Sequence, residues 1–515
     1  MEEHTGTISF RMSPTAYAYF VKQDALAYSF QGEQTQDGAI LAKGKELSYG
    51  TYACLSAGMT DYLLVKNTDD TYTITAPSGS KFDFDSAGRL VKQTDENGKT
   101  TSLSYSDGKT TITEDISGRR LYLNYNGDGL LSSVSDDNGR KTAFKYDSEK
   151  NLSSITNALG DTVYYRYDEK HRITSEVGDE GTVVQNAYDG EGRVTRQTDA
   201  FGNAMALEYT EEGGNTKITI HDMDGSDKYA IVDARGQILQ DTNANGKSVR
   251  YTYDDNGNMT SQVDPEGNAA FYAYDGKNRM VSFTDTGNLT TDMAYDAHGN
   301  LISVSGTKDR RASYTYDSRN LMTSKTDAMG AKTTYTYDED GLLARESIEG
   351  LGSTEYTYEK GQIASSKDRN GNVTKFTYDG MGNLARTEDS MGGVTVNTYD
   401  AIGRLLTTTD ALGNRTAYTY DTVGNITSMT DALGNKTVYE YDKAGRLTKE
   451  TAPDGTSVKY TYDIMGNCIR KSFPDGTSES YAYDSAGNRV KTTLADGSEI
   501  SIVMLIWRFQ VVKIS

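Results

Sequence analysis

This chain of 515 residues contains 74 Asp and Glu residues, whose carboxylates are candidate ligands for calcium. Residues 241–246 (Asp-x-Asn-x-Asn-Gly) match the opening of an EF-hand loop, whose oxygens bind calcium. The position that requires a bidentate Glu is Thr252, and no helical pattern flanks the stretch. We therefore interpret 241–246 as a turn, and residues 222–225 (Asp-Met-Asp-Gly) as a similar, longer turn.

Catalytic groupings are not predicted either. The histidines His4, His171, His221 and His298 share no HxH or HxxxH spacing, and no GxSxG elbow is present. The regularly placed carboxylates leave no pair that stands out as a glycosidase dyad. We expect His298 to be a solvated turn residue, and Cys468 to be a small buried apolar residue, because its neighbours at that position are Leu or Ile. The prediction is a non-enzymatic protein with no catalytic, metal-binding or cofactor-binding residues.

Tyrosine shows the most regular spacing, and there are 38 of them. From Phe84 to Tyr483 an in-register residue, almost always Tyr, closes a repeat about every 21 residues, which makes about 20 repeats; a longer one precedes Val232. A periodic array of this kind predicts a repeat architecture. An exposed tyrosine stripe could stack on sugars, but packing within a sheet is the interpretation we favour.

Each repeat predicts two strands and two turns. In residues 414–420, Thr416, Tyr418 and Tyr420 alternate onto one face of a strand. A turn with the pattern Asp-x-x-Gly follows, in which the Asp side chain bonds backbone N–H groups and Gly supplies a positive φ. Ile426 begins the return strand, at a position where aliphatic residues recur. Strands of about five to six residues are what this spacing leaves.

About 40 consecutive strands exceed what an open twisted sheet accommodates, since such sheets rarely pass about ten strands without curling. We therefore predict an all-β fold, an array of about 20 β-hairpins coiled into a spiral sheet or a partial hollow β-shell.

Composition limits the partners. The formal net charge is -21 and no Lys/Arg-rich run offsets it, so nucleic acid is excluded as an expected partner. The two cysteines, Cys54 and Cys468, indicate neither a disulfide framework nor a zinc site. The amino terminus lacks the basic and apolar regions of a secretory signal.

Three segments are predicted. Residues 1–75 are a β-rich, non-repeat leader, and residues 76–497 are the repeat array. Residues 498–515 are an atypical apolar tail that contains the only Trp. The tail is too short to span a bilayer, and we interpret it as a capping strand or as the end of a truncated reading frame.

The repeated pattern resembles the YD repeat of the Rhs (rearrangement hot spot) family. The best matches are Tyr-Asp-Ala-Ile-Gly-Arg-Leu-Leu-Thr-Thr-Thr-Asp-Ala-Leu-Gly-Asn at residues 399–414 and Tyr-Asp-Lys-Ala-Gly-Arg-Leu at residues 441–447. Similar repeats occur in bacterial wall-associated proteins, in the cocoon of insecticidal toxin complexes and in the YD shell of teneurins. The resemblance covers roughly residues 80–497.

The resemblance implies a hollow β-shell which, in bacterial members, encloses a C-terminal toxic domain. A core motif of the DPxGRF kind and a toxin domain are not found here, so self-cleavage and toxicity are not implied for this chain. The expected function is a structural shell or scaffold segment of a secreted or cell-surface bacterial protein. The alternative is an adhesion module that binds carbohydrate or a partner protein through its repeats.

Overall fold

The computed structural model describes residues 62–178, 181–306 and 311–501, except for the side chain of Thr182, and the backbone of short strands within residues 2–54 and 512–513. Most of the predicted leader and almost all of the predicted apolar tail lie outside the fully described residues. The limits predicted for the three segments therefore stay predictions.

The chain divides into two compact units, and each unit combines two stretches that are distant in the sequence. Unit 1 contains residues 1–139 and 291–376, and unit 2 contains residues 140–290 and 377–515. Because each unit joins an early and a late part of the repeat array, residues more than two hundred positions apart can meet within one unit.

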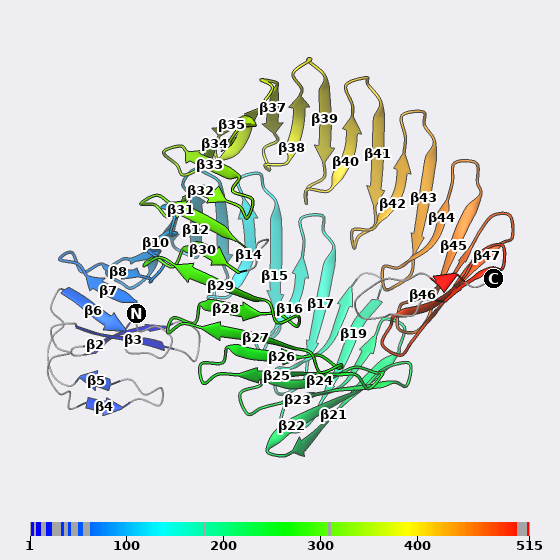
Figure 1. Cartoon of the computed structure of the whole chain (residues 1–515), viewed down its shortest axis with the longest axis horizontal. Helices are drawn as coiled ribbons and strands as arrows, with labels where there is room; N and C mark the ends of the chain where they lie inside the picture. Colours follow the sequence, from blue (N-terminus) through cyan, green and yellow to red (C-terminus); the bar gives the residue numbers. More distant parts are fainter. Residues whose placement is uncertain are drawn as a thin grey trace. The chain divides into compact units, whose positions relative to one another are not determined.

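Every regular element among the described residues is a β-strand (Figure 1). The strands assigned to unit 1, with β29 and β37 at its limits, are β1 Glu2–His4, β2 Thr7–Arg11, β3 Tyr17–Lys22, β4 Gly32–Gln34, β5 Ile40–Ala42, β6 Gly50–Cys54, β7 Leu63–Lys66, β8 Tyr72–Thr75, β9 Lys81–Phe84, β10 Leu90–Thr94, β11 Thr100–Ser106, β12 Lys109–Glu114, β13 Arg120–Tyr125, β14 Leu131–Asp136, β29 Thr290–Tyr295, β30 Leu301–Ser305, β31 Ala312–Tyr316, β32 Met322–Thr326, β33 Lys332–Tyr337, β34 Leu343–Ile348, β35 Gly352–Glu359, β36 Gln362–Lys367 and β37 Val373–Tyr378.

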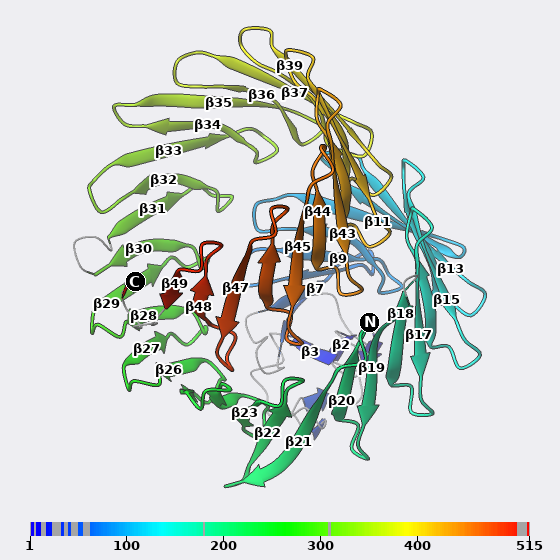
Figure 2. The ribbon, with the colours of Figure 1, turned by 90° about the vertical axis from the view of Figure 1, so that its right-hand side faces the viewer.

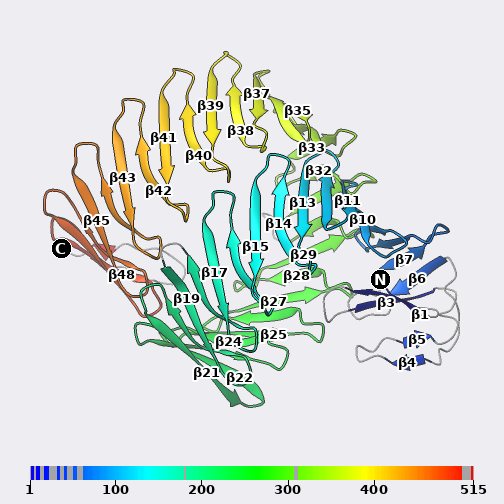
Figure 3. The same ribbon diagram turned by 180° about the vertical axis from the view of Figure 1, so that it is seen from behind.

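Unit 2 has the same hairpin pattern, which is visible from behind in Figure 3. Its strands are β15 Lys141–Tyr146, β16 Leu152–Thr156, β17 Thr162–Tyr167, β18 Ile173–Gly178, β19 Gly181–Tyr188, β20 Val194–Asp199, β21 Ala204–Glu212, β22 Asn215–His221, β23 Asp227–Val232, β24 Ile238–Thr242, β25 Ser248–Tyr253, β26 Met259–Val263, β27 Ala269–Tyr274, β28 Met280–Thr284, β38 Leu384–Glu388, β39 Val394–Tyr399, β40 Leu405–Thr409, β41 Arg415–Tyr420, β42 Ile426–Thr430, β43 Lys436–Tyr441, β44 Leu447–Thr451, β45 Ser457–Tyr462, β46 Cys468–Ser472, β47 Ser478–Tyr483, β48 Arg489–Thr493, β49 Glu499–Ser501 and β50 Val512–Lys513.

Within each unit most consecutive strands pair antiparallel, so the array of YD-type hairpins predicted from the sequence is confirmed. In the hairpin of β41 and β42, Ala417 lies opposite Thr430 and Tyr420 lies opposite Ile426. The register shifts between Thr419 and Tyr420, and the same shift precedes the closing tyrosine in most hairpins of the array. This recurrent β-bulge was not predicted; it adds local twist and bends the strand.

The turns have the predicted construction. In the turn after β40, the N–H of Gly413 donates to the carbonyl of Asp410 (3.0 Å), and the N–H of Asp410 donates to the carbonyl of Asn414 (3.0 Å). Gly413 has φ +84°, the left-handed conformation that closes a three-residue hairpin loop. The side chain of Asp410 accepts hydrogen bonds from the N–H groups of Leu412 and Asn414, both at 2.9 Å.

The best-buried apolar residues among those described lie at the start of the array. Leu64, Tyr72, Ile74 and Phe84 on β7, β8 and β9 are almost fully buried. The strands β8 and β9 form the hairpin that the sequence predicts around residues 77–79. Further along, most side chains are half-buried. Stability of the repeats therefore comes from many small contacts between neighbouring hairpins.

Each unit contains contacts that show the sheet returning on itself. In unit 1, the side-chain amide of Asn320 donates to the carbonyl of Glu96 (3.4 Å). In unit 2, the amide of Asn245 donates to the carboxylate of Asp484 (3.0 Å), and the hydroxyl of Ser485 donates to the side-chain oxygen of Asn245 (2.5 Å). These partners are 224 to 240 positions apart, or about eleven repeats. The sheet therefore coils within each unit.

Candidate functional site

The closing tyrosine of each repeat ties its hairpin to the preceding one. The hydroxyl of Tyr420 donates to the carbonyl of Leu405, which begins the return strand of the repeat before (2.7 Å). We call the recurrent set of these bonds the tyrosine ladder. Its donor and acceptor pairs, at 2.7 to 2.9 Å, are Tyr105–Leu90, Tyr167–Leu152, Tyr188–Ile173, Tyr209–Val194, Tyr253–Ile238, Tyr316–Leu301, Tyr337–Met322, Tyr358–Leu343, Tyr399–Leu384, Tyr420–Leu405, Tyr441–Ile426, Tyr462–Leu447 and Tyr483–Cys468.

Burial raises the pKa of several ladder tyrosines, which keeps those hydroxyls protonated. Burial raises the pKa of Tyr420, and the nearby Arg404 only partly opposes this. The pKa values of Tyr337 and Tyr358 are raised by burial in the same way. The hydroxyl donates a hydrogen bond within the sheet and the ring is half-buried, so both parts of a ladder tyrosine are used in contacts within the sheet, as the packing interpretation expects. The stripe is thus a poorer candidate for sugar stacking than its regular spacing implied.

Arginine at the fifth position of a YD turn, the turn that follows the closing tyrosine, connects neighbouring repeats. Arg404 donates from Nε to the carboxylate of Asp400 in its own turn (2.6 Å) and from a terminal nitrogen to the carbonyl of Asp421 in the next YD turn (2.9 Å). Its guanidinium lies 4.7 Å from the ring centroid of Tyr420, a cation–π contact. Arg172 and Arg446 form the same set of contacts. The sequence shows the Arg, but only the fold shows that it spans two repeats.

The two kinds of turn lie at opposite ends of the strands and so form two edges of the sheet. The YD edge carries the turns after the closing tyrosines, and the TD edge carries the turns after the return strands, such as Asp410–Asn414. In unit 2 the TD turn containing Asn245 meets the YD turn containing Asp484 and Ser485. A second contact of the same kind places the guanidinium of Arg446 5.0 Å from the ring centroid of Phe201.

The calcium-like stretch is a turn, as predicted. The side-chain oxygen of Asn243 accepts hydrogen bonds from the N–H groups of Asn245 (3.1 Å) and Lys247 (3.0 Å). The side chain of Asn245 is used in the contact with Asp484 and Ser485. These bonds give the polar residues of this stretch a structural role.

The turn at residues 222–225 has the ordinary length, which corrects the prediction of a longer turn. The N–H of Asp222 donates to the carbonyl of Ser226 (2.8 Å), and the N–H of Gly225 donates to the carbonyl of Asp222 (3.0 Å), as in the other turns. The additional residues extend the preceding hairpin instead, in which β21 has nine residues and β22 has seven. Pairing along longer strands gives them backbone partners.

The sequence did not reveal a cluster around His221 in this longer hairpin. His221 Nδ1 lies 2.8 Å from the Asp227 carboxylate, and Nε2 lies 3.5 Å from the Glu208 carboxylate. The bond to Asp227 raises the pKa of His221, with Glu208 adding to the effect. Cross-strand pairing brings the three together, and the group is exposed. With no nucleophile among these contacts, the arrangement pairs charges.

Two other candidate residues can be placed. His298 is exposed in its turn, as predicted, and its N–H donates to the carboxylate of Asp296 (2.9 Å). Cys468 is half-buried rather than buried, because most side chains of the array, including those at the aliphatic position, remain in partial contact with solvent. Its carbonyl accepts the ladder bond of Tyr483.

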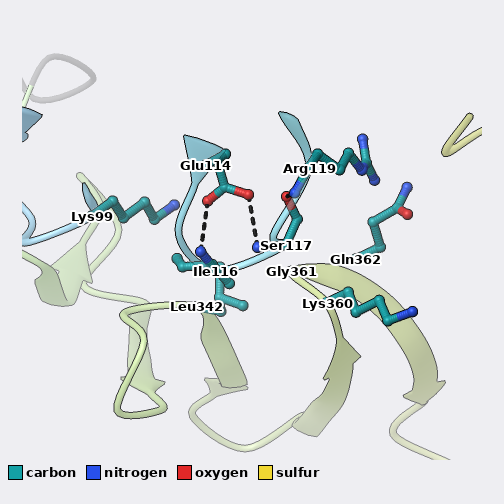
Figure 4. Close-up of a pocket in the computed structure, with 9 residues that line it drawn as sticks. All are labelled: Lys99, Glu114, Ile116, Ser117, Arg119, Leu342, Lys360, Gly361 and Gln362. Carbon is teal, nitrogen blue, oxygen red and sulfur yellow. Dashed lines mark hydrogen bonds between the residues drawn. The ribbon is translucent and has the colours of Figure 1, made fainter. Parts of the chain in front are cut away.

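A crevice of about 260 Å³ in unit 1 lies between the turn at Glu114–Gly118 and the turn at Lys360–Gly361 (Figure 4). Glu114 accepts hydrogen bonds from the N–H groups of Ile116 (3.2 Å) and Ser117 (2.8 Å). The side chains of Arg119 and Lys360 extend away from Glu114 in Figure 4, so the cations of the lining do not converge on one point. We interpret the crevice as the seam between two parts of the coiled sheet.

Within the described residues, no group of three His, Cys, Asp or Glu side chains is arranged to hold a metal ion. The same part of the chain contains no helix long and apolar enough to cross a membrane.

Comparisons with known proteins agree with this geometry. A family profile described as RHS Repeat matches residues 84–118, 125–162, 146–184, 399–436, 420–457, 441–477 and 466–499, and one described as Teneurin YD-shell matches residues 204–387. The fold and ladder define a β-hairpin repeat protein of the YD-shell type. The chain belongs to the Rhs/YD-repeat family. A search of the curated proteins finds no match.

Solved structures share the fold at low sequence identity. The crystal structure of TcdB2-TccC3 without its hypervariable C-terminal region matches with a TM-score of 0.54 and 12% identity, over 99% of this chain and 37% of that chain. The crystal structure of TcdB2-TccC3 matches with a TM-score of 0.52 and 13% identity, over 97% of this chain and 35% of that chain. The crystal structure of TcdB2-TccC3-Cdc42 matches with a TM-score of 0.52 and 15% identity, over 80% of this chain and 27% of that chain. The chain thus spans between about a quarter and two-fifths of the length of these structures.

Proposed function

We propose that this chain is a non-enzymatic wall segment of an Rhs-type shell, which encloses a C-terminal toxic domain in the assembled protein. The tyrosine ladder is the observation that carries the proposal. It uses the most regular residue of the sequence to fasten each hairpin to the one before, as a continuous wall requires. The match of residues 204–387 to the Teneurin YD-shell and the fold shared with TcdB2-TccC3 support it.

The partner in this proposal is a polypeptide cargo, and the location is outside the producing bacterium or on its surface. The family resemblance supports both. The recurrent carboxylates form turns, so the proposal assigns them no catalytic role.

Protease protection tests the proposal. A protease-sensitive reporter polypeptide is joined after Ser515, and its cleavage is compared with that of the same reporter added as a separate molecule. A wall that shields the cargo slows cleavage of the joined reporter at least about tenfold. Equal cleavage rates for the joined and the separate reporter would contradict enclosure.

Adhesion through the repeats is tested in parallel on a glycan array. Saturable sugar binding that is lost in Tyr164→Ala, whose side chain is among the exposed large hydrophobic ones, would favour the adhesion module instead. The ladder residue Tyr420 is the matched comparison, because its hydroxyl is already bound to the sheet.

A further inference from the structure

Three consecutive TD turns of unit 2 present large apolar side chains almost entirely to solvent. Met391, Leu412 and Leu433 are 93%, 88% and 87% exposed, and each is the second residue after the Asp of its turn. We call residues 389–435 with these three side chains the apolar edge. The next TD turns along the chain carry Asp454 and Asp475 at the same position, so the apolar segment is bounded.

The equivalent position is more covered in the earlier stretch of unit 2. Phe201 and Leu159 occupy it in their TD turns and are 42% and 38% exposed. Phe201 lies under the guanidinium of Arg446, which comes from a YD turn of the later stretch. Phe201 is thus an apolar residue of a TD turn that contacts a YD turn of the later stretch.

The same pairing repeats elsewhere in unit 2, where Asn245 on a TD turn binds Asp484 and Ser485 on a YD turn. Contacts between the two stretches therefore join the TD edge of residues 140–290 to the YD edge of residues 377–501. Among the described residues of unit 2, this pairing does not include the apolar edge or the YD edge of residues 147–193. The second carries Arg172 and Arg193 at the turn position that Arg446 occupies.

We propose that the apolar edge of one molecule docks on the YD edge, residues 147–193, of a second copy of this chain. Arg172 and Arg193, at the turn position from which Arg446 contacts Phe201, then pack the methylene groups of their side chains against the apolar edge. The two edges have matching spacing, because both place one turn per pair of strands, about 9.6 Å apart. The proposal continues an interface already present in unit 2 and is independent of the cargo.

The size of the contact determines the affinity of the association, and its symmetry determines the kind of assembly that forms. Three exposed side chains make a patch on the order of 400 Å², below what a standard-size interface buries from each partner, so association is weak and depends on concentration. Different edges meet, so the contact is heterologous and gives open chains of molecules rather than a closed dimer.

Sedimentation of the full chain over a wide range of concentration tests the proposal. The average mass of the wild-type chain should rise with concentration. The variant Met391→Asp/Leu412→Asp/Leu433→Asp should weaken association at least about tenfold, because it places charge in the contact. The matched control is Val423→Asp, since Val423 is 71% exposed at the same turn position but lies on the YD edge of the later stretch. It should leave association unchanged.

A complementation experiment distinguishes this contact from other self-association. Arg172→Glu/Arg193→Glu should also abolish growth in mass, with an unchanged circular dichroism spectrum confirming the fold. In an equimolar mixture of the two variants, the arginine variant keeps an intact apolar edge and the triple Asp variant keeps an intact YD edge. The mixture should therefore form 1:1 complexes that grow no further. A wild-type chain that stays monomeric at every concentration, or a mixture of the two variants that does not associate, would overturn the proposal.

Discussion

At the scale of the residue, each ladder tyrosine combines two contributions in one side chain. Its ring is half-buried against the sheet, and its hydroxyl reaches a carbonyl of the neighbouring hairpin. Asp combines two roles in a similar way: one carboxylate oxygen accepts backbone N–H groups, and the other accepts from the Asn or Arg at the end of the turn. Residues of these types recur because each satisfies several polar groups at once.

Tyr420→Phe should lower the free energy of unfolding by about 0.5–1.5 kcal/mol, because it removes the hydroxyl bond to Leu405 and leaves that carbonyl without its partner. The shift of the urea midpoint measures the loss. Tyr164→Phe is the control, since no hydroxyl bond of Tyr164 is found among the described residues, and its effect should be close to zero. Equal effects of the two changes would contradict a structural role of the ladder.

The acid stability of the turns follows from Asp168. Hydrogen bonds from the side chain of Arg172, followed by backbone N–H donors, lower its pKa from 3.8 to about 2 in the folded chain. A lowered folded-state pKa means that the carboxylate stabilises the fold above about pH 4, and that this contribution is lost as the pH falls from about 4 to about 2.

Asp168→Asn should therefore be less stable than the wild type at pH 7, and the difference should shrink as the pH approaches about 2.5. The Asn side chain keeps the turn closed, because Asn126 accepts the N–H groups of Asp128 (3.0 Å) and Leu130 (2.9 Å) in an equivalent turn. Urea midpoints of both proteins between pH 7 and pH 2.5 provide the measurement. A difference that does not change with pH would show that the ion pair with Arg172 contributes nothing.

At the scale of the element, the hairpin with an Asp-x-x-Gly turn depends on one left-handed residue at the fourth position of that turn. Gly413 has φ +84°, and Asn278, Asn288 and Asn320 occupy the same turn position with φ of 59° to 60°. Asn tolerates this conformation better than other residues with a Cβ atom. The turn chemistry therefore sets the loop length, and the loop length sets the register of the two strands.

Gly413→Ala should destabilise the chain by about 1–2 kcal/mol, purely through backbone strain. A Cβ atom at this position meets nothing within 4 Å, so steric overlap does not contribute. Gly413→Asn is the matched comparison and should cost less. Unfolding in urea measures both, and an Asn variant as unstable as the Ala variant would contradict the explanation.

At the scale of the whole molecule, each unit combines an early and a late stretch of the array, whose strands Figure 2 shows from the side, and side-chain contacts join the two stretches. Among the described residues these contacts include Arg446 over the ring of Phe201 and the bond of Asn245 to Asp484, both in unit 2. Neighbouring hairpins, by contrast, share complete backbone ladders. Backbone hydrogen bonds therefore stabilise the array along its length, and side-chain contacts join its early and late stretches within each unit.

A double-mutant cycle of Phe201→Ala and Arg446→Ala measures one contact across the coil. The coupling should be about 0.5–1 kcal/mol, the range for a cation–π pair near the surface. The cycle separates this term from the bonds of Arg446 to its own turn, which the single change also removes. A coupling of zero, measured from urea unfolding, would mean that Phe201 and Arg446 contribute independently.

Much of the fold could be predicted because the repeat is local. The spacing of Asp and Gly determines each turn, and the alternation around Tyr418 and Tyr420 determines which face each strand presents. The bulge before Tyr420 could not be predicted, because it follows from how the two strands twist together. Similarly, the sequence predicts a longer turn at residues 222–225, whereas the additional residues lengthen the paired strands β21 and β22.

The hairpin, its turns and the family follow from the amino-acid sequence alone, since they depend on contacts within a repeat or between adjacent repeats. Only the tertiary structure decided which turns meet after about eleven repeats, and therefore why Phe201 is partly covered while Leu412 and Leu433 are exposed in turns of the same type. Every repeat has nearly the same sequence, so a repeat does not by its own residues specify which distant turn it meets. Twist accumulated over many strands, rather than any single residue, sets which edges of the sheet face each other.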